Sequence, residues 1–507
     1  MSGNAGLSDF LAMGEPMAQR PWPRFRLTRE QWLELAMHLT IAEWPLLGLW
    51  AEPAEVHAAF FEETSGAMAV ASLPCPDRRF PSLAGVRPGA LRLERAAQDL
   101  FGLVAEGLPD PRPWLDHGQW ALGHPLADGA THSAPQRLAA EYAFLPVEGE
   151  GLHQVPVGPV HAGIIEPGHF RFHCNGEAVV RLEERLGYAH KGSESLMAGK
   201  PVAAAARLAG RLSGDSTVAS TLAFCRAVEA ASGTILPERA VWLRALMAEL
   251  ERLANHFGDI GAICNDAAFA FLLTHFGILR ERVLLEAGAA FGHRLMMDKV
   301  IPGGVAGDID AGTVARLRAL VAEMRPRLAE LMRVYDSKPS LLDRTVETGM
   351  VKPELVRRFA AGGYVGRASG RGFDARRSPG YPPYDQLDLA VAVLSDGDVH
   401  SRLLLRAQEA AVSLGLVDKI LMRLPAGSIA APLAARSGEG LALVEGFRGD
   451  ILAWVALAGD GTVRRAHLRD PSWFQWPLLE AAIGGNIVAD FPLCNKSFNC
   501  SYSGHDL

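Results

Sequence analysis

The hydrophobic pattern of this chain alternates between short strand-like runs and long helical segments. Runs rich in β-branched and aromatic residues predict strands, whereas apolar residues recurring at helical spacing predict helices. The runs that predict strands cover 46–51, 56–61, 67–73, 441–445, 451–457 and 463–468. The segments that predict helices cover 93–101, 217–229, 240–257, 269–295, 314–334 and 398–414. The pattern therefore predicts an α+β protein, with a small α+β domain first and a mainly helical domain after it that carries a peripheral hairpin and a meander.

The stretch from Gly158 to Arg171 predicts a tight corner that leads into the hairpin. Pro167-Gly168 interrupts an apolar run, and the chain then resumes strand-like alternation. Asn175-Gly176 is a typical two-residue hairpin turn, after which 178–182 runs back as the second strand.

This corner carries three side chains that can exchange or hold protons, Glu166, His169 and Arg171. Such a cluster suits proton chemistry, because a carboxylate and an imidazole can both titrate when their surroundings shift their pKa. The alternative is a hairpin tip that is polar only because it faces water. The residues alone leave both interpretations open.

Composition and charge narrow the class of protein. The chain has 507 residues, 49% of them apolar and 21% charged, which is typical of a globular protein with more than one domain. The net charge of −7 argues against nucleic acid as a partner. The longest uncharged apolar stretch, between Asp266 and Arg280, is too short to cross a bilayer, so we expect no direct membrane span.

The cysteines argue against several metal sites. The six cysteines form no C-x-x-C pair, which disfavours structural zinc and iron–sulfur clusters bound by this chain. Such sparse cysteines do not indicate a disulfide framework and are typical of a reducing cytoplasm. We expect them to be small buried hydrophobic residues.

Three motifs in the second domain carry a family resemblance. They are Gly158-Pro-Val-His161, Glu166-Pro-Gly-His169 and Gly187-Tyr-Ala-His-Lys-Gly-Ser-Glu194. The chain resembles the large subunit shared by complex I, where it is the 49 kDa subunit, and by membrane-bound group 4 [NiFe] hydrogenases. It is most similar to the formate hydrogenlyase and hydrogenase-4 component G type, and the resemblance covers nearly the whole chain.

A second resemblance lies in the first domain, between residues 91 and 126. The motif-bearing residues are Glu94-Arg95, Asp99–Gly102, Gly107, Pro109-Asp110 and Arg112. They resemble the 30 kDa subunit of complex I, which is often fused in front of the large subunit in the hydrogenase relatives. The resemblance implies a bracing domain over 1–145, whose motifs do not extend before residue 90, and a large-subunit domain over 150–507.

The resemblance to hydrogenases implies a nickel–iron centre held by four thiolates, and this chain lacks all four. The early ligand motif falls on Ser213 and Ser216, and the late motif falls on Ser472 and Gln475. Hydroxyl and amide groups are poor replacements for the soft thiolates that nickel and low-spin iron require. We therefore expect no nickel–iron centre. A hard cation such as magnesium on Ser213, Asp215 and Ser216 is an alternative.

In complex I the corresponding metal site is absent, and its position is a pocket for a quinone headgroup, lined by a histidine and a tyrosine. The resemblance implies a similar pocket here. By this resemblance His169 is the histidine, whereas the tyrosine position falls on Phe224, which has no hydroxyl to donate. Glu166 matches the hydrogenase position that relays protons. The residues expected to line the pocket or its proton path are Glu166, His169, Arg211, Asp215 and Arg367.

Three functions follow from these expectations. The favoured one is a metal-free large subunit of a membrane-attached oxidoreductase, which passes electrons from an iron–sulfur partner to quinone or another small acceptor, coupled to proton or ion movement. The second is a non-catalytic scaffold or coupling subunit, and the third is an active [NiFe] hydrogenase. The first two functions imply two kinds of partner, a subunit with iron–sulfur clusters and antiporter-like membrane subunits. They imply that this chain itself binds no cofactor, except a possible quinone. They also imply a cytoplasmic location on the inner face of the membrane.

Overall fold

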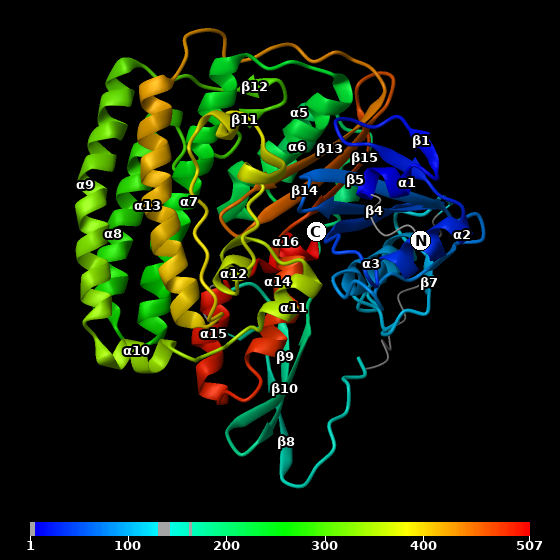
Figure 1. Ribbon diagram of the computed structural model, residues 1–507, viewed down its shortest axis with the longest axis horizontal. Helices are drawn as coiled ribbons and strands as arrows, with labels where there is room; N and C mark the ends of the chain where they lie inside the picture. Colours follow the sequence, from blue (N-terminus) through cyan, green and yellow to red (C-terminus); the bar gives the residue numbers. More distant parts are fainter. Residues whose placement is uncertain (1–5, 130–141, 162–164) are drawn as a thin grey trace.

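The structure is a computed structural model that describes residues 6–129, 142–161 and 165–507. A helical bundle and an N-terminal sheet domain lie on opposite sides of a three-stranded meander, and a second small sheet projects beyond them (Figure 1). In the part of the chain that the structure describes, no helix is both long and apolar enough to cross a membrane. The predicted α+β class, with a mainly helical second part, is confirmed.

The N-terminal domain is built on a mixed sheet with strand order β1-β2-β5-β4-β3, in which only the β2–β5 pair is parallel. The three predicted strands are present as β3, β4 and β5, and the Thr28–Gln31 capping box starts α2. The elements of this domain are α1 (Leu7–Leu11), β1 (Glu15–Met17), β2 (Arg24–Arg26), α2 (Arg29–His38), β3 (Leu46–Glu52), β4 (Glu55–Glu62), β5 (Ala67–Pro74), β6 (Arg79–Pro81), α3 (Ala90–Phe101) and β7 (Val104–Glu106).

Two three-stranded antiparallel sheets belong to the second part of the chain. The projecting sheet has the order β10-β9-β8. Its β9–β10 turn consists of Gly176 and Glu177, one residue later than the predicted Asn175-Gly176, because Asn175 still pairs with Ala178 in the sheet. The predicted meander is present in the order β13-β14-β15. The strands are β8 (Leu152–Val157), β9 (His169–Asn175), β10 (Ala178–Arg185), β11 (Val300–Ile301), β12 (Gly304–Val305), β13 (Gly438–Glu445), β14 (Asp450–Leu457) and β15 (Val463–Arg469).

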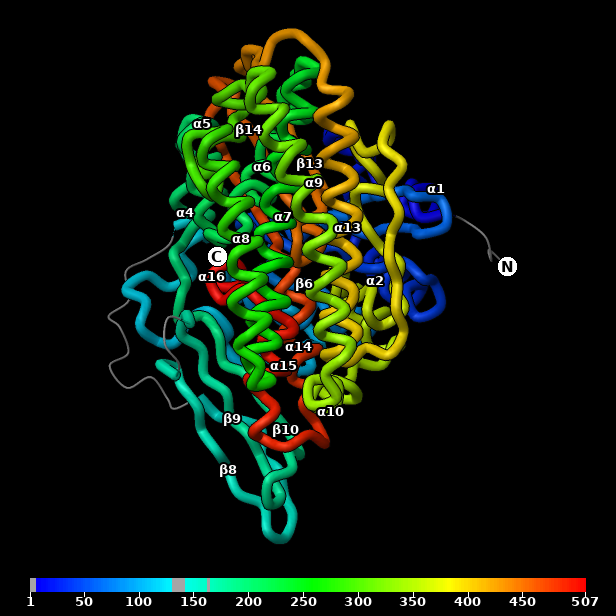
Figure 2. The backbone as a smooth tube through the Cα atoms, turned by 90° about the vertical axis from the view of Figure 1, so that its left-hand side faces the viewer, coloured from blue at the N-terminus to red at the C-terminus, as the bar shows by residue number. Residues whose placement is uncertain are grey.

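The helical bundle is centred on α7, which packs against α8 and α13, while α9 covers both of these neighbours (Figure 2). Helix α6 instead packs on the meander strands β13 and β14. The helices of the second part are α4 (Ser193–Met197), α5 (Val202–Ala209), α6 (Thr217–Ser232), α7 (Glu238–Asp266), α8 (Ala270–Phe291), α9 (Ala311–Asp336), α10 (Pro339–Thr345), α11 (Pro353–Phe359), α12 (Gly363–Ala368), α13 (Val399–Arg423), α14 (Ser472–Ala482), α15 (Phe491–Phe498) and α16 (Tyr502–Asp506).

Helix α7 is longer than its apolar pattern predicts, because it continues to Asp266 through Gly258 and Gly261. A side chain at Gly261 would lie 3.2 Å from the Leu273 Cα of α8, so the glycine permits a close approach of the two helices. Packing therefore outweighs the low helix propensity of glycine. Helix α8 ends earlier than predicted, at Gly292, which adopts a left-handed conformation.

The N-terminal sheet packs directly on the meander. Leu47, Trp50 and Phe61 from the first sheet share a buried cluster with Leu443 and Trp454 from β13 and β14. A second, larger apolar core also mixes residues from both sides of the predicted 145–150 boundary. The two parts therefore bury a common interior, rather than touching only through a polar linker.

Buried charges join the helices to the meander. Arg367 of α12 is 1% exposed and donates hydrogen bonds of 2.8 Å to Glu409 of α13 and of 2.8 Å to Glu445 of β13. Glu409 also bonds His256 of α7, at 2.9 Å. A neighbouring carboxylate, Glu249 of α7, accepts from Arg376, Tyr384 and Ser413. Each buried charge thus has an opposite charge or a donor, as its removal from water requires.

The pKa values of these carboxyls follow from their partners. Burial by itself would raise the pKa of Glu409, but the Arg367 charge and the His256 hydrogen bond hold it well below its usual value. Burial and the nearby Asp374 charge raise the pKa of Glu445 to about 7. Arg367 is therefore the cation that keeps Glu409 ionised inside the protein.

The start of α6 depends on a side chain from another helix. The backbone N–H groups of Val218 and Ala219, free at the helix terminus, donate to the Glu251 carboxyl of α7 at 2.7 and 3.0 Å. Burial dominates and raises the pKa of Glu251 to about 8, although these two hydrogen bonds act in the opposite direction. Glu251 thus fixes the position at which α6 begins.

We predict that Arg367→Met destabilises the protein by about 3–5 kcal/mol, because it leaves the buried Glu409 and Glu445 without their shared cation. Urea unfolding of the full chain measures the change. The matched control is Arg211→Met, since Arg211 pairs with Asp298 at the surface, where the two side chains are 41% and 39% exposed. This control should lower the free energy of unfolding by less than about 1 kcal/mol. Equal losses in the two variants would contradict the role assigned to Arg367.

We predict that Glu251 makes the stability of the protein fall as pH rises from about 5 to about 8. The folded state keeps the Glu251 proton up to a pKa of about 8, whereas the unfolded chain releases it near its ordinary value of 4.5. The stability that this proton contributes is therefore fully present below the unfolded pKa and is lost as pH approaches the folded one. In that range the free energy of unfolding of the wild type, minus that of the Glu251→Gln variant, should decrease by about 1.4 kcal/mol per pH unit. Denaturant titrations at several pH values measure this difference, and parallel pH curves would contradict the prediction.

Candidate functional site

The candidate site begins at the short turn between α5 and α6. Ser213 adopts an extended conformation, and a single 3₁₀ turn over Gly214–Ser216 leads into α6. Within this turn Ser213 donates to the Asp215 carboxylate at 2.7 Å. The predicted early motif is therefore a compact loop whose hydroxyl and carboxylate groups face one another.

Arg448, in the turn between β13 and β14, binds this loop. Its guanidinium donates to both oxygens of Asp215, at 2.7 and 2.5 Å, and to Ser216 at 3.1 Å. It also donates to the Asn499 carbonyl at 2.5 Å. Burial would raise the pKa of Asp215, but the Arg448 charge and hydrogen bonds outweigh it and lower that pKa below its usual value. Asp215 is therefore an ionised partner of a buried arginine.

The late motif reaches the same place from α14. The Ser472 hydroxyl accepts a hydrogen bond of 2.8 Å from the Ser501 backbone N–H, and the Ser501 hydroxyl donates to Ser213 at 2.9 Å. Gln475 donates to the Arg448 carbonyl at 2.7 Å. The structure thus brings Ser213, Ser216, Ser472 and Gln475 together, with Arg448 and Ser501 as the groups that connect them.

This arrangement bears on the alternative of a hard cation at Ser213, Asp215 and Ser216. All three side chains already accept hydrogen bonds from Arg448, the one to Ser213 at 3.4 Å. A divalent cation would have to sit beside the arginine charge and displace these contacts. The geometry therefore opposes magnesium at these oxygens.

A cavity of 920 Å³ opens beside this cluster. Its walls come from α7, α8, the corner before β9, and the C-terminal segment. Glu166 and Asp215 line it, as expected from the sequence, and Glu166 accepts a 3.0 Å hydrogen bond from the Ser503 N–H. Residues 162–164 of the predicted corner, which include Ile164, lie outside the described residues. The wall residues that sequence reasoning missed include His161, Asn255, Asp266, Arg448, Lys496, Ser501 and Tyr502.

The other residues expected at the pocket do not line this cavity. His169 bonds the Gly158 carbonyl and accepts from Arg171, on the projecting sheet. Arg211 forms an ion pair with Asp298 at the surface, and Arg367 forms a buried ion pair with Glu409 of α13. Each arginine has a nearby carboxylate that holds it away from the cavity, and that pairing was not visible in the sequence.

Phe224, the residue at the expected tyrosine position, also lies away from the cavity. It is fully buried on α6 within the main apolar core. The missing hydroxyl therefore does not alter the cavity wall. The signals that could have identified the missed wall residues were the charged Arg448 in a predicted turn and the polar run 499–503 near the end of the chain.

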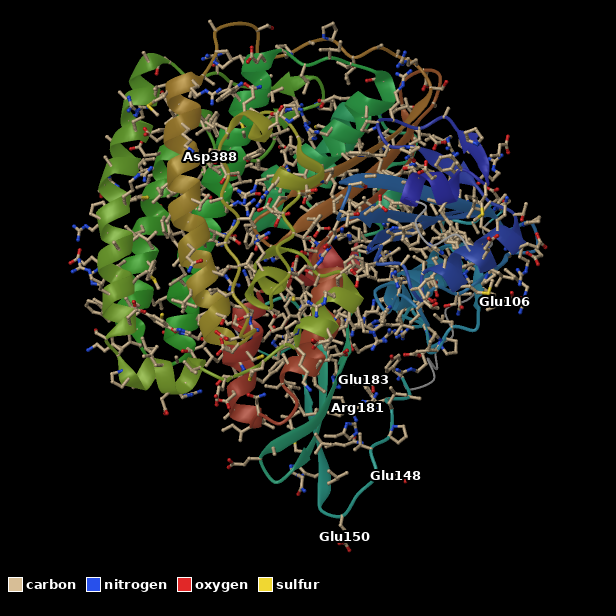
Figure 3. The ribbon with its side chains drawn as sticks, in the orientation of Figure 1. Glu106, Glu148, Glu150, Arg181, Glu183 and Asp388 are labelled. Carbon is tan, nitrogen blue, oxygen red and sulfur yellow. The ribbon has the colours of Figure 1, made fainter. Side chains whose placement is uncertain are left out.

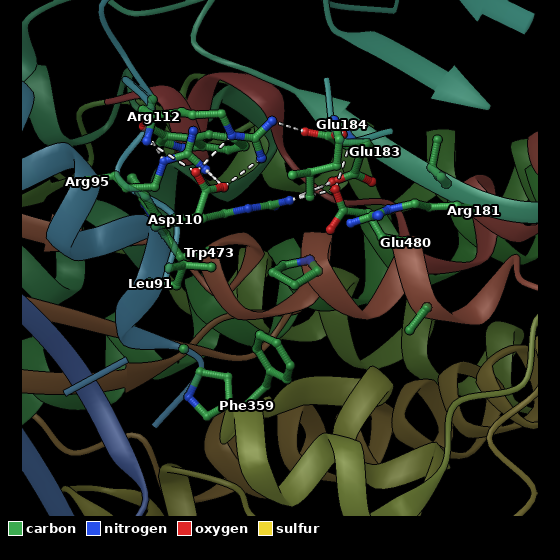
Figure 4. Close-up of a pocket in the computed structure, with 18 of the residues that line it drawn as sticks. Leu91, Arg95, Asp110, Arg112, Arg181, Glu183, Glu184, Phe359, Trp473 and Glu480 are labelled. Carbon is green, nitrogen blue, oxygen red and sulfur yellow. Dashed lines mark hydrogen bonds and ion pairs between the residues drawn. The ribbon is translucent and has the colours of Figure 1, made fainter. Parts of the chain in front are cut away.

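A second pocket of 410 Å³ lies where the N-terminal domain meets β10 and α14 (Figure 4). Arg112 binds both Asp110 and Glu183, at 2.6 and 2.7 Å, and Arg92 binds Glu184 and Glu480, at 3.4 and 2.9 Å. Figure 3 shows Glu183 near the root of the projecting sheet and Glu150 near its far tip. The charges of this pocket pair with one another across the junction, which favours a structural role over a ligand site.

All six cysteines are buried and free, in agreement with the expectation of small buried hydrophobic residues. Burial raises the pKa of the Cys225 and Cys500 thiols. None of the six lies among the four converging positions, and only Cys500 borders the cavity. These thiols are therefore poor metal ligands as they stand.

Comparison with known proteins connects this geometry to a family. Residues 28–135 match the family described as respiratory-chain NADH dehydrogenase, 30 Kd subunit, and residues 266–437 match the corresponding 49 Kd subunit. The first match begins well before residue 90, upstream of the motifs that carried the resemblance.

Individual relatives extend these matches. The chain is 32% identical to formate hydrogenlyase subunit 5 of Escherichia coli, over 84% of this chain and 77% of the relative. It is 29% identical to hydrogenase-4 component G of the same organism, over 85% and 76%. Among solved structures, a chain of the membrane-bound sulfane sulfur reductase, an archaeal respiratory membrane complex, matches with a TM-score of 0.67 and 25% identity, over 72% of this chain and 100% of that one.

These matches confirm the resemblance that the motifs indicated. The chain belongs to the large-subunit family shared by complex I and the membrane-bound group 4 hydrogenases, with its 30 Kd-type and 49 Kd-type parts fused in one polypeptide.

Proposed function

We propose that this chain is a metal-free large subunit of a membrane-attached oxidoreductase of the complex I and hydrogenase type. In this role it receives electrons from an iron–sulfur partner and passes them to a quinone, or to another small acceptor, in the 920 Å³ cavity. One observation carries the proposal. The four side chains expected in place of the thiolates belong to one hydrogen-bond network through Arg448 and Ser501, and each of them makes a hydrogen bond in it.

The chemistry of these four side chains does not suit a nickel–iron centre. Three hydroxyls and one amide are hard, neutral donors, whereas nickel and low-spin iron need soft thiolates. Ser213 and Ser216 also accept hydrogen bonds from the Arg448 guanidinium. A metal cluster placed here would meet a buried positive charge and no thiolate.

The neighbouring cavity has properties suited to an organic acceptor. Its walls combine apolar side chains such as Phe170, Leu273 and Phe491 with polar groups, a composition typical of small-molecule sites. Asp215 and Arg448 neutralise each other at one end. Glu166 lines the cavity, and in this proposal its carboxyl group transfers protons to the acceptor.

The reaction fixes which partners the chain needs. Reduction of a quinone to a quinol takes up two electrons and two protons, and the cysteines described above do not form a site that could carry electrons. We therefore infer an iron–sulfur partner as the electron donor, and antiporter-like membrane subunits through which ion movement is coupled. The chain then lies on the inner face of the cell membrane, held there by those partners.

A scaffold or coupling subunit is the second candidate. The observation that favours it is the pairing of two of the four carboxylates on the cavity wall, Asp215 with Arg448 and Asp259 with Arg406. Paired charges are less available for proton transfer than free ones. A scaffold would keep the shape of the large subunit while leaving the cavity unused.

We predict that the isolated chain contains far less than one nickel and one iron atom per polypeptide, because no thiolate is present to bind them. Elemental analysis of the chain after removal of loosely bound metal measures this content. Nickel and iron in equal, near-stoichiometric amounts would contradict the proposal and would favour the hydrogenase alternative.

We predict that Gly277→Trp lowers quinone-dependent turnover of the assembled complex at least several-fold. Gly277 lies on α8 at the cavity wall, and a side chain built there meets no atom within 4 Å. The position thus has room for a Cβ at the cavity wall, and the substitution replaces a residue of low helix propensity. The melting temperature should thus be unchanged or higher.

The matched control is Gly288→Ala on the same helix, where an added Cβ makes only an ordinary 3.7 Å contact, with Arg294. This variant should keep full turnover. Size-exclusion chromatography of both complexes checks that assembly is intact. Full turnover in an assembled Gly277→Trp complex would exclude the cavity as the acceptor site and would favour the scaffold.

A further inference from the structure

The β3–β4 hairpin of the N-terminal domain brings together two carboxylates and an imidazole that the proposed function does not use. Glu52 and Glu55 lie directly opposite each other across the hairpin, and His57 follows Glu55 by two residues on the same face of the strand. Like charges directly opposite each other on neighbouring strands are destabilising. A positive group between these carboxylates would remove that repulsion.

The atoms of these three side chains that can bind a cation face one another. The Nε2 atom of His57 lies 3.5 Å from Oε2 of Glu52 and 3.9 Å from Oε2 of Glu55. All three atoms lie within 4.8 Å of one another. A tetrahedral zinc ion with bonds of about 2.0–2.2 Å to nitrogen and oxygen separates its ligand atoms by about 3.3–3.6 Å. The observed spacing is therefore close to the one that such an ion requires.

His57 points to a ligand at this position. The residue is fully buried, its ring stacks on Trp454 of β14, and its Nδ1 bonds the Ser72 hydroxyl at 2.8 Å. Its Nε2 has no hydrogen-bond partner among the described residues, although two carboxylates flank it. In metal sites a bond of this kind at one ring nitrogen orients the other nitrogen towards the metal. With the Nδ1 proton donated to Ser72, the Nε2 lone pair faces two carboxylates, an arrangement that a cation stabilises.

The neighbouring arginines leave the required oxygens available. Arg464 donates to Oε1 of Glu52, and Arg26 donates to Oε1 of Glu55 at 3.1 Å. Both arginines are partly exposed, so water screens their charges. Arg24 lies 4.0 Å from Oε2 of Glu55, but it pairs more closely with a carboxylate of β13, at 3.0 Å. The Oε2 atoms of both carboxylates thus remain for a cation.

We propose that Glu52, Glu55 and His57 bind a Zn²⁺ ion, with water as the fourth ligand. Imidazole and carboxylate groups are ordinary zinc ligands, and the two glutamates keep a small exposed edge through which the ion and a water molecule can enter. At the Ser213–Ser216 loop, by contrast, Arg448 occupies both oxygens of the carboxylate.

The bound ion fastens the end of the β3–β4 hairpin beside the meander on which its strands pack. The site uses no cysteine, so the lack of a C-x-x-C pair does not bear on it. It is also independent of the proposed function, which concerns only the absence of nickel and iron.

Titration of the metal-stripped full chain with Zn²⁺ alone, followed by calorimetry, tests this proposal. We expect one equivalent of zinc to bind tightly and to raise the melting temperature, since the ion binds only the folded hairpin. Glu55→Gln keeps the shape of the side chain and removes its charge, and it should weaken this binding by at least about tenfold. His57→Gln, which removes the ligand nitrogen, should have the same effect.

His467→Gln is the matched control. His467 is a buried histidine of the same region, whose ring stacks on Trp50 with centroids 5.8 Å apart. Its Nδ1 bonds Glu194 at 2.6 Å, and its Nε2 likewise has no partner within the described ranges. Because it faces one carboxylate rather than two, its substitution should leave the stoichiometry and the affinity of zinc binding unchanged.

The outcomes decide the proposal. Zinc that binds the wild type, Glu55→Gln and His57→Gln equally well would be an adventitious ion only and would overturn it. A wild type that binds no zinc more tightly than about 10 µM would also overturn it, and His57 would then hold a proton between the two carboxylates. Neither result affects the quinone cavity, so failure here is distinguishable from failure of the proposed function.

Discussion

Pairing between buried arginines and carboxylates is the interaction on which the architecture depends. The meander, α7, α12 and α13 come from distant parts of the chain. Arg367 of α12 joins Glu409 of α13 to Glu445 of the meander, and Glu409 bonds His256 of α7. A charge in this interior is tolerated only with its partner, so each element fixes the position of the next. Apolar packing supplies most of the driving force, but these pairs decide which faces meet.

The same constraint shapes the cavity. Arg448 extends from the β13–β14 turn to the Ser213–Ser216 loop and binds Asp215 and Ser216, so a network of hydrogen bonds fills this loop. A cavity of 920 Å³ lies beside this loop. A hydrogen-bonded cluster and a large cavity therefore lie next to each other in one fold.

The 30 Kd-type and 49 Kd-type parts, fused in one chain, are also joined by direct side-chain contacts. Trp50 of the N-terminal sheet lies 5.8 Å from Trp454 of the meander, measured between ring centroids. At the opposite side of the junction, Arg92 and Arg112 bridge to carboxylates of β10 and α14. The first part thus supports the strands from which Arg448 reaches the site, as the expected bracing role implies.

Local signals in the sequence determined the secondary structure well. Apolar periodicity located the long helices and the meander, and the Asn175-Gly176 pair located the β9–β10 turn to within one residue, because these signals depend on neighbouring residues only. The motifs also identified the family, which the comparisons confirm. Only the tertiary structure decided that Arg367 and Phe224 lie inside the protein, and that Arg448 and Tyr502 line the cavity. The reason is physical: burial and charge pairing depend on which distant segments meet, and no pattern along the chain encodes the partner of a given side chain.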